Sequence, residues 1–353
     1  MSITMTIWSL PLTGIRGKRP WDEDWKTAYK HDSRMILNGE HLEVIPIPHF
    51  EGMTLRHYEY RNEDLMPKFS GVYDFEFLKP HLSTTYCEIV IDDSFWKAPF
   101  MPMYPSHNEV MKLQTVMAAS GALITSLRLI GYNRFIAPCI LKHSTLQNAT
   151  NCMDGAIEFY PHHPFHMPMP DLENSKSIIS NEDFLWVSEA TRTLYQLMFI
   201  EDFSPAMTAM SYYYHDMPQR AKMTLIWAAI EDLLKPKPTD EHGIRFGFRA
   251  RGAMMLGRSD EEIRKLFEQI GNLYGKRNAA THGRQFTYNK GIIPTPDNTQ
   301  LTTDMLSLRS SYQLLCEILI RVVDRGALYT ETELLELENK YKEKFPVGST
   351  NIS

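Results

Sequence analysis

Residues 259–283, SDEEIRKLFEQIGNLYGKRNAATHG, decide the fold of the C-terminal half of the chain. Ser259 and Glu262 stand three positions apart before an apolar series, which is the spacing of a capping box at the start of a helix. Apolar residues then recur at intervals of three or four from Ile263 to Tyr274, as they do on one face of a helix. The stretch therefore predicts a long amphipathic helix that ends in a cluster of polar residues.

Similar signals predict further helices on both sides of this one. Ser204 precedes Pro205, an arrangement typical of a helix start, and Pro236 follows an apolar series as a helix end. Short connections between amphipathic helices are typical of an antiparallel bundle. We therefore expect an all-α antiparallel helical bundle over residues 180–345, followed by a tail, 346–353. Its helices are expected to begin at residue 180 or 181, at 204, at 219, near 239, at 259, at 303 and at 330.

The N-terminal half has a different pattern. Short segments that mix apolar and polar residues are separated by proline and glycine, which favours strands, and one amphipathic helix is expected over 106–129. Residues 1–142 are therefore predicted to form an α+β domain of unknown role, with sensing or regulation as candidates. Four prolines stand between Tyr160 and Asp171, and proline breaks helices. Residues 143–179 are therefore expected to be a Pro- and His-rich connector.

Composition limits the class of protein. The 353 residues include 37 Lys and Arg against 43 Asp and Glu, a formal net charge of -6. This balance argues against a nucleic-acid binder that is basic overall, although it allows a local basic patch. The first residues have no basic region before a long apolar core, and residues 116–130 are too short and too polar to span a bilayer. We expect a cytoplasmic protein that does not enter a membrane.

Metal sites have little support in the sequence. No pair of the four cysteines is spaced Cys-x-x-Cys, as a zinc knuckle or a redox site would require. His162, His163 and His166 are spaced closely enough to bind a divalent ion, but no carboxylate or thiol stands at regular spacing from them. They also fit a surface connector. No metal and no cofactor are expected.

The polar cluster that ends the quoted stretch holds Arg277, Asn278 and His282 within six positions. If the helix continues, Asn278 and His282 stand four residues apart and share one face. One interpretation is an ordinary helix end, with Gly283 as the cap and Arg277 in solvent. The other is a functional site, because a run of polar residues is unusual inside a helical bundle.

The residues around the cluster add a resemblance. The motif Arg-Asn-x-x-x-His (277–282), with Leu-Tyr before it and glycine behind it, resembles the Arg-x(4–6)-His motif of HEPN domains, especially the ApeA-like branch. The segment TLIWAAIEDLL (224–234), with its Ile230-Glu231 pair, is similar to the apolar helix of that branch. An arginine-rich segment, 245–249, lies between the two, where the family often carries a variable insert. The resemblance covers roughly residues 180–345.

The resemblance implies a HEPN-type helical domain that forms a homodimer in which two copies of the motif face each other. In active members the paired motifs form a metal-independent endoribonuclease, which leaves 2′,3′-cyclic phosphate and 5′-hydroxyl ends. Histidine can move protons at neutral pH, so His282 is the expected general acid and base. Arg277 is expected to bind the phosphate and stabilise its developing charge. Asn278 would orient the substrate or His282, and Glu231 is a candidate to brace Arg277.

Local charge agrees with an RNA ligand. Residues 241–290 contain ten Lys and Arg against five Asp and Glu, a net charge of +5. Phe246, Phe248 and Tyr288 are interleaved with these charges and are of the kind that stacks on unpaired bases. A solvated helix face explains the arginines almost equally well. The residues predicted to bind RNA are Arg245, Arg249, Arg251, Lys276 and Arg284.

Three functions follow from these interpretations. The first is a toxin-like endoribonuclease of bacterial antiphage defence that cleaves single-stranded or transfer RNA. In that function the N-terminal half senses a phage-derived trigger, restrains the nuclease or selects the RNA. The second is a non-catalytic HEPN module that binds RNA or a protein, or dimerises. In the third, the N-terminal half has an activity of its own and the bundle only dimerises the chain.

Overall fold

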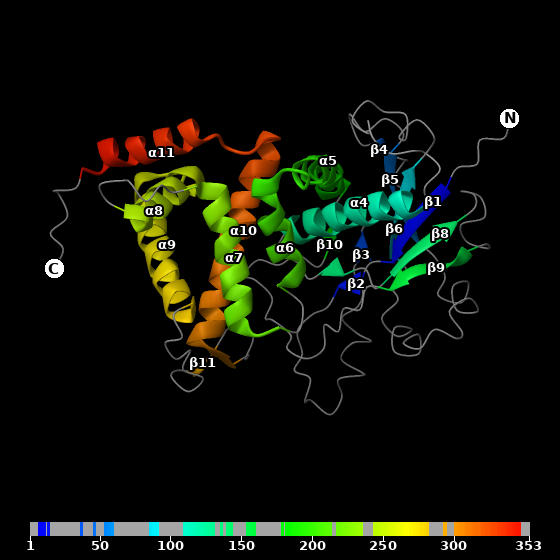
Figure 1. The fold of residues 1–353 in the computed structure, drawn as a ribbon, viewed down its shortest axis with the longest axis horizontal. Helices are drawn as coiled ribbons and strands as arrows, with labels where there is room; N and C mark the ends of the chain where they lie inside the picture. The colour runs from blue at the N-terminus through cyan, green and yellow to red at the C-terminus, as the bar shows by residue number, and fades with distance from the viewer. Residues whose placement is uncertain are drawn as a thin grey trace. The chain divides into compact units, whose positions relative to one another are not determined.

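The structure is a computed structural model (Figure 1). The chain divides into two compact units, Met1–Tyr195 and Gln196–Ser353. Sequence patterns placed the start of the C-terminal domain at 180, whereas the division falls at 195/196. The described residues are 6–11, 13–14, 36–37, 45–46, 53–59, 85–91, 109–130, 135–136, 139–143, 153–159, 178–179, 181–213, 217–235, 243–281, 292–294 and 300–346.

Strands of the first unit form a six-stranded antiparallel sheet with the order β4-β5-β6-β1-β8-β9. β1 lies in its middle and pairs with β6 on one side and with β8 on the other. Two further strand pairs, β10 with β3 and β2 with β7, are only two residues long. The strands are β1 (Thr6–Pro11), β2 (Thr13–Gly14), β3 (Ile36–Leu37), β4 (Ile45–Pro46), β5 (Met53–Glu59), β6 (Thr85–Ile91), β7 (Phe135–Ile136), β8 (Cys139–His143), β9 (Met153–Phe159) and β10 (Ile178–Ile179).

Strand β9 lies within the stretch that the sequence predicted as a connector, 143–179. Residues 153–159 were expected to lie outside the N-terminal domain, but they pair with β8 and form the last strand of the sheet. Period-two alternation is weak in MDGAIEF, and the pairing carries register shifts, so the strand has little local signature. The prolines between Tyr160 and Asp171 lie outside the described residues. The assignment of all of 1–142 to one α+β domain also extends beyond these residues and stays a prediction.

Two helices of the first unit differ from their predictions. Helix α4 (Glu109–Leu129) was expected to be amphipathic, but it is buried on nearly every side from Thr115 onward. Its buried Ser126 shares a 2.8 Å hydrogen bond with Thr191 of α5 (Asn181–Leu197). Each of these two hydroxyl groups also bonds a carbonyl of its own helix, Ser126 that of Leu123 and Thr191 that of Val187, so both are satisfied in the interior. The contact also explains why most of α5, expected to open the C-terminal bundle, belongs to the first unit.

The second unit is built of helices, as the sequence predicted. One short antiparallel strand pair, β11–β12, occurs in the connection before α10, which was expected to be irregular. The helices α7 and α10 begin at the predicted positions, 219 and 303. The elements are η4 (Glu201–Phe203), α6 (Ser204–Tyr212), α7 (Gln219–Leu234), α8 (Gly243–Leu256), α9 (Asp260–Thr281), β11 (Ile292–Pro294), β12 (Gln300–Thr302), α10 (Thr303–Arg325) and α11 (Glu331–Lys344).

Local caps set the helix ends. Gly326 closes α10 with φ of 77°, a left-handed conformation that glycine adopts without steric cost. At the predicted helix start at 330, a capping box opens α11, since Thr330 and Glu333 exchange side-chain and backbone hydrogen bonds. Hydrogen bonds from Arg325 and then from Thr330 lower the pKa of Glu333 to about 2.

Helix α7 lies at the centre of the second unit, where α6, α9 and α10 pack against it (Figure 1). Its Trp227 is fully buried and donates a 3.2 Å hydrogen bond from Nε1 to Ser311 of α10. The rings of Phe248 and Tyr274 meet Trp227 edge-on, with centroids 6.1 and 5.4 Å away. This aromatic contact fixes α8 and α9 on the side of α7 that carries Glu231.

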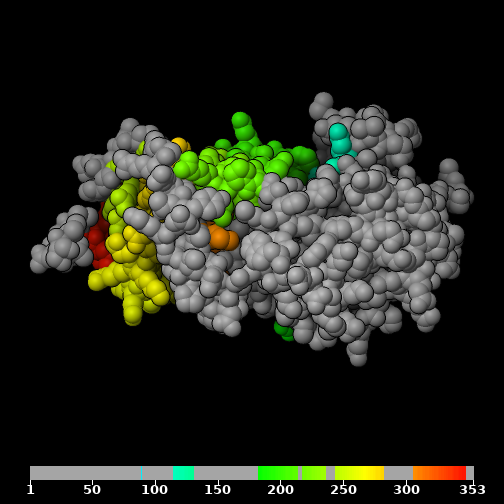
Figure 2. Space-filling view, turned by 90° about the horizontal axis from the view of Figure 1, so that it is seen from below, coloured from blue at the N-terminus to red at the C-terminus, as the bar shows by residue number. Residues whose placement is uncertain are grey.

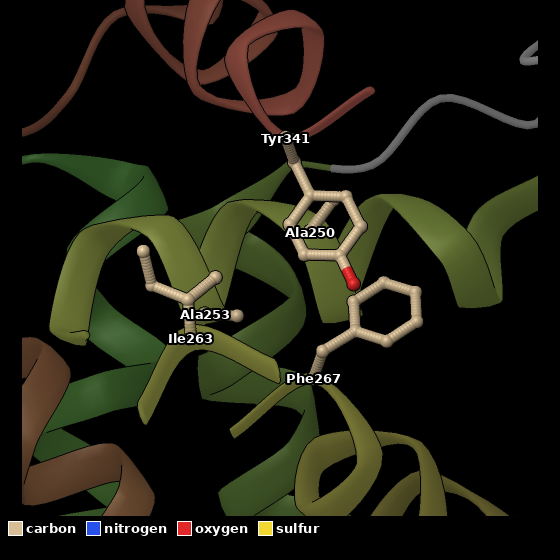
Figure 3. Packing of buried hydrophobic residues seen from close by; sticks show 5 residues of the cluster. All are labelled: Ala250, Ala253, Ile263, Phe267 and Tyr341. Atoms are coloured by element: carbon tan, nitrogen blue, oxygen red, sulfur yellow. The ribbon is translucent and has the colours of Figure 1, made fainter. Parts of the chain in front are cut away.

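A second cluster joins α8, α9 and α11 (Figure 3). Tyr341 of α11 points over Ala250, and its ring stacks on Phe267 of α9 with centroids 4.4 Å apart. Burial raises the pKa of Tyr341 to about 12. Phe246, predicted as a base-stacking residue, packs edge-on against Phe267 and Tyr341 instead. In the space-filling view, parts of α9 (yellow) and α11 (red) lie side by side at one end of the second unit (Figure 2).

A buried ion pair holds α11 to α8. Nη2 of Arg251 lies 2.8 Å from Oε2 of Glu338, and the two side chains are 1% and 0% exposed. Nε of Arg251 donates to the same oxygen at 3.0 Å. Removing one member of such a pair leaves the other charge buried without its counterion.

Glu338→Ala should therefore lower the free energy of unfolding by about 3–5 kcal/mol. Glu343→Ala, at an exposed position of the same helix, should change it by less than about 0.5 kcal/mol. Urea denaturation of both variants measures the difference. Equal losses would show that the Arg251–Glu338 pair does not hold α11 in place.

Helices α8 and α9 approach closely at Gly271. A Cβ atom there would lie 2.7 Å from Nε of Arg249, which donates to the carbonyl of Phe267 at 3.0 Å. Arg249 also stacks on the ring of Phe267, with its Cζ 3.8 Å from the centroid, so it is not free to move aside. At Gly275, one turn further along α9, a Cβ atom would meet nothing within 4 Å.

These two glycines should therefore respond in opposite directions to alanine. Gly275→Ala should raise the free energy of unfolding by about 0.5–1 kcal/mol, because alanine is the better helix former. Gly271→Ala should lower it by about 1–2 kcal/mol through overpacking against Arg249. Thermal and urea unfolding measure both changes. A stabilising Gly271→Ala would contradict the close approach.

Candidate functional site

The polar cluster at the end of α9 is held to α7 by an ion pair. Nη2 of Arg277 lies 2.8 Å from Oε1 of Glu231, and the two side chains are 21% and 30% exposed. Nη1 of Arg277 donates a 3.1 Å hydrogen bond to Oδ1 of its neighbour Asn278. The guanidinium is therefore fixed from two directions, and Glu231 makes the contact with Arg277 that the sequence led us to expect.

One donor of Arg277 is left over. Its Nε is buried and has no hydrogen-bond partner in the part of the chain that the structure describes. The guanidinium carbon lies 5.7 Å from the ring centroid of Tyr274, one turn earlier on α9. A buried donor without a partner costs about 1–3 kcal/mol, so such groups call for an explanation.

Arg277 lies on the wall of a pocket of about 520 Å³. The pocket has an apolar and aromatic part and a charged part. Its charged lining has three carboxylates and two cations, so an anion entering it must compete with protein carboxylates for the cations. The lining residues are Ile244, Phe248, Tyr274, Asp202, Glu231, Asp232, Lys235 and Arg277.

Burial changes the acidity of two of these carboxylates. The pKa of Glu231 is raised above 4.5, mainly by burial, although the charge of Arg277 opposes the shift. The pKa of Asp232 is also raised, first by burial and then by the nearby charge of Asp202, while Lys235 opposes it. Both side chains therefore hold a proton to higher pH than a solvated carboxyl group does.

The structure locates only part of the predicted catalytic set. Arg277, Asn278 and Glu231 are in contact, through the two bonds of Arg277. His282 lies outside the described residues. The catalytic roles of all four residues stay predictions.

The arginines expected to bind RNA have other partners. The prediction that Arg251 binds RNA is wrong, because its side chain is 1% exposed and its donors bond Glu338 and the carbonyl of Leu234 at the end of α7. Arg249 pairs with Glu268 at 2.6 Å, and Arg245 donates to the carbonyl of Gly271 at 3.2 Å. These arginines join α8 to its neighbours. Lys276 is exposed, and Arg284 lies outside the described residues, as does Tyr288.

Sequence patterns missed three charged lining residues, namely Asp202, Asp232 and Lys235. Asp232 and Lys235 had a weak signal, because Asp232 lies in the last turn of α7 beside Glu231 and Lys235 directly follows that turn. Asp202 had none, since its place on the pocket depends on how η4 packs against α7. The predicted metal alternative, His162, His163 and His166, lies outside the described residues. In the described ranges no group of three or more His, Cys, Asp and Glu residues is placed to bind a metal ion.

Comparison with known proteins finds no matching family model, no matching curated protein and no matching solved structure. Among the described residues, no helix has the length and apolar character needed to cross a membrane. Any function must therefore be argued from the residues of this chain.

The raised pKa of Glu231 gives a pH test. The folded chain binds this proton more tightly than the unfolded chain does, so the stability contributed by Glu231 falls as pH rises from 4.5 through the higher folded-state value. The stability difference between wild type and Glu231→Gln should therefore decrease as the pH rises above 4.5. Urea unfolding at several pH values measures it, with the exposed Glu336→Gln as the control. An increase with pH would show that attraction to Arg277 outweighs burial.

Proposed function

We propose that the C-terminal unit is a HEPN-type endoribonuclease and that the pocket beside Arg277 receives the RNA backbone. The observation that carries the proposal is the state of Arg277. Its guanidinium is fixed by Glu231 and Asn278 at the wall of an open pocket, with a buried Nε still without a partner in the described part of the chain. A guanidinium held in this way is pre-organised to bind phosphate oxygens.

The proposed reaction divides between two side chains. His282, five positions after Arg277, takes the proton of a ribose 2′-hydroxyl and returns a proton to the leaving 5′-oxygen. Arg277 binds the phosphate oxygens on which negative charge develops. The products are a 2′,3′-cyclic phosphate and a 5′-hydroxyl end, and the proton transfers need no metal ion or other cofactor.

The proposed assembly is a homodimer with the two motifs facing one cleft. We place the protein in the cytoplasm as a toxin-like effector of antiphage defence that acts on single-stranded or transfer RNA. The N-terminal unit would sense a phage-derived trigger, restrain the nuclease or select the RNA. These statements rest on the resemblance of Arg-Asn-x-x-x-His and the Ile-Glu helix to HEPN domains.

A second candidate is a non-catalytic HEPN module that binds RNA or a protein through the same pocket. The observation in its favour is the charge of the lining, because Glu231 already occupies Arg277 and two more carboxylates lie nearby. Such a module would retain RNA without producing cleaved ends.

The purified full chain should cleave single-stranded RNA in EDTA. His282→Ala should reduce the rate by about 10²–10⁴-fold through loss of proton transfer, and Arg277→Ala by about 10²–10³-fold through loss of charge stabilisation. Gel analysis of labelled RNA measures the rates and the chemistry of the ends. Arg325→Ala, which removes an arginine paired with Glu333 away from the pocket lining, is the matched control.

Three outcomes separate the candidates. Full activity in His282→Ala would reject the catalytic role of His282. Binding without cleavage by wild type, weakened by Arg277→Ala, would establish the non-catalytic module. If the wild-type chain neither binds nor cleaves RNA, both functions proposed for the pocket are rejected. Size-exclusion chromatography with light scattering tests whether His282→Ala keeps the dimer.

A further inference from the structure

Lys235 has an unusual backbone for its residue type. It follows the last residue of α7 with φ of 40° and ψ of 53°, a left-handed conformation. Among the residues that the structure describes, it is the one non-glycine residue with positive φ. Glycine is the usual residue at such helix ends, because a side chain there costs free energy. A lysine in this position therefore calls for a compensating role.

Buried bonds hold this strained helix end in place. Arg251 donates from Nη1 to the carbonyl of Leu234 at 3.0 Å and also to the carbonyl of Lys235. The guanidinium of Arg251 is in turn fixed by Glu338. A positive charge at the C-terminal end of a helix also interacts favourably with the helix dipole. The backbone of Lys235 is thus specified by three elements, α7, α8 and α11.

The side chain of Lys235 reaches the candidate site. It lines the same pocket as Arg277, and its Nζ lies 2.5 Å from Oδ2 of Asp202. Lys235 is 35% exposed and Asp202 51%, so solvent screens this pair and it adds little to stability. A weak surface pair does not account for the strain at Lys235.

We propose that Lys235 is a second phosphate-binding residue of the pocket. In the free protein Asp202 holds the ammonium group of Lys235 in place, and a phosphate of the RNA replaces Asp202 as its partner. This inference rests on the proposed function of the pocket as an RNA site. Lysine is a compact charge with three donors, which suits a phosphate that a fork-shaped arginine binds from another direction. The pocket lining holds two cations, Lys235 and Arg277, one for each of two adjacent phosphates of an RNA backbone.

The proposal makes opposite predictions for the two members of the ion pair. A purely structural pair would be weakened in the same way by removal of either partner. A binding lysine that competes with RNA for Asp202 behaves differently, because loss of Lys235 weakens RNA binding whereas loss of Asp202 frees the ammonium and strengthens it.

The test measures binding of a fluorescent, single-stranded 2′-O-methyl RNA to the full chain in EDTA by anisotropy. Lys235→Gly should weaken binding about tenfold and reduce the slope of log K against log salt by about 0.7, the value of one phosphate contact on a single strand. It should not lower the unfolding temperature, because glycine suits the left-handed backbone. Asp202→Asn should strengthen binding about threefold, and Lys235→Arg should retain most of it.

The matched controls are Lys344→Ala and Asp260→Asn, which form a similar 2.6 Å pair away from the pocket lining and should leave binding unchanged. If Arg277→Ala weakens binding but the Lys235 and Asp202 variants do not, Lys235 is not a ligand and the RNA site still stands. If Lys235→Gly and Asp202→Asn weaken binding together, the pair is structural. Wild-type protein that binds no RNA overturns this inference together with the proposed function.

Discussion

The contact between Arg277 and Glu231 is the interaction on which the account depends. It joins the end of α9 to α7, and it fixes a guanidinium at the wall of a pocket instead of leaving it in solvent. Two effects oppose each other in setting the pKa of Glu231. Burial favours the protonated form and raises the pKa, while the charge of Arg277 favours the ionised form and lowers it. The ion pair holds Arg277 at the pocket wall even though burial disfavours the charged form of Glu231.

The residues that stabilise the second unit also shape the site. Arg251 satisfies the carbonyls at the end of α7 and is neutralised by Glu338, so α11 helps to hold the helix turn that carries Glu231, Asp232 and Lys235. Phe248 and Tyr274 pack on Trp227 and line the pocket as well. Phe248 and Tyr274 therefore belong both to the core around Trp227 and to the pocket wall, so a change in either affects stability as well as the site.

Local signals in the sequence predicted helices well. Caps and apolar spacing predicted where α7 and α10 begin, because helix starts depend on residues close in sequence. The Ile-Glu pair indicated Glu231 as the partner of Arg277, because the pair belongs to a recurring motif. Contacts between distant residues were not predictable. The partner of Arg251 is 87 residues away, so an arginine with a buried structural role looked like a surface charge. Likewise, the burial of α4 on nearly every side depends on contacts with other segments, which the sequence of the helix alone does not predict.

The most direct test follows the side-chain Nε–H signal of Arg277 by NMR during titration with a 2′-O-methyl RNA oligonucleotide, assigned with Arg277→Lys. The Nε–H of Arg249, which is bonded to the carbonyl of Phe267, gives an internal reference within the same bundle. We expect a saturable shift of the Arg277 signal and little change at Arg249. An Arg277 signal that does not move while RNA binds elsewhere on the chain would contradict it.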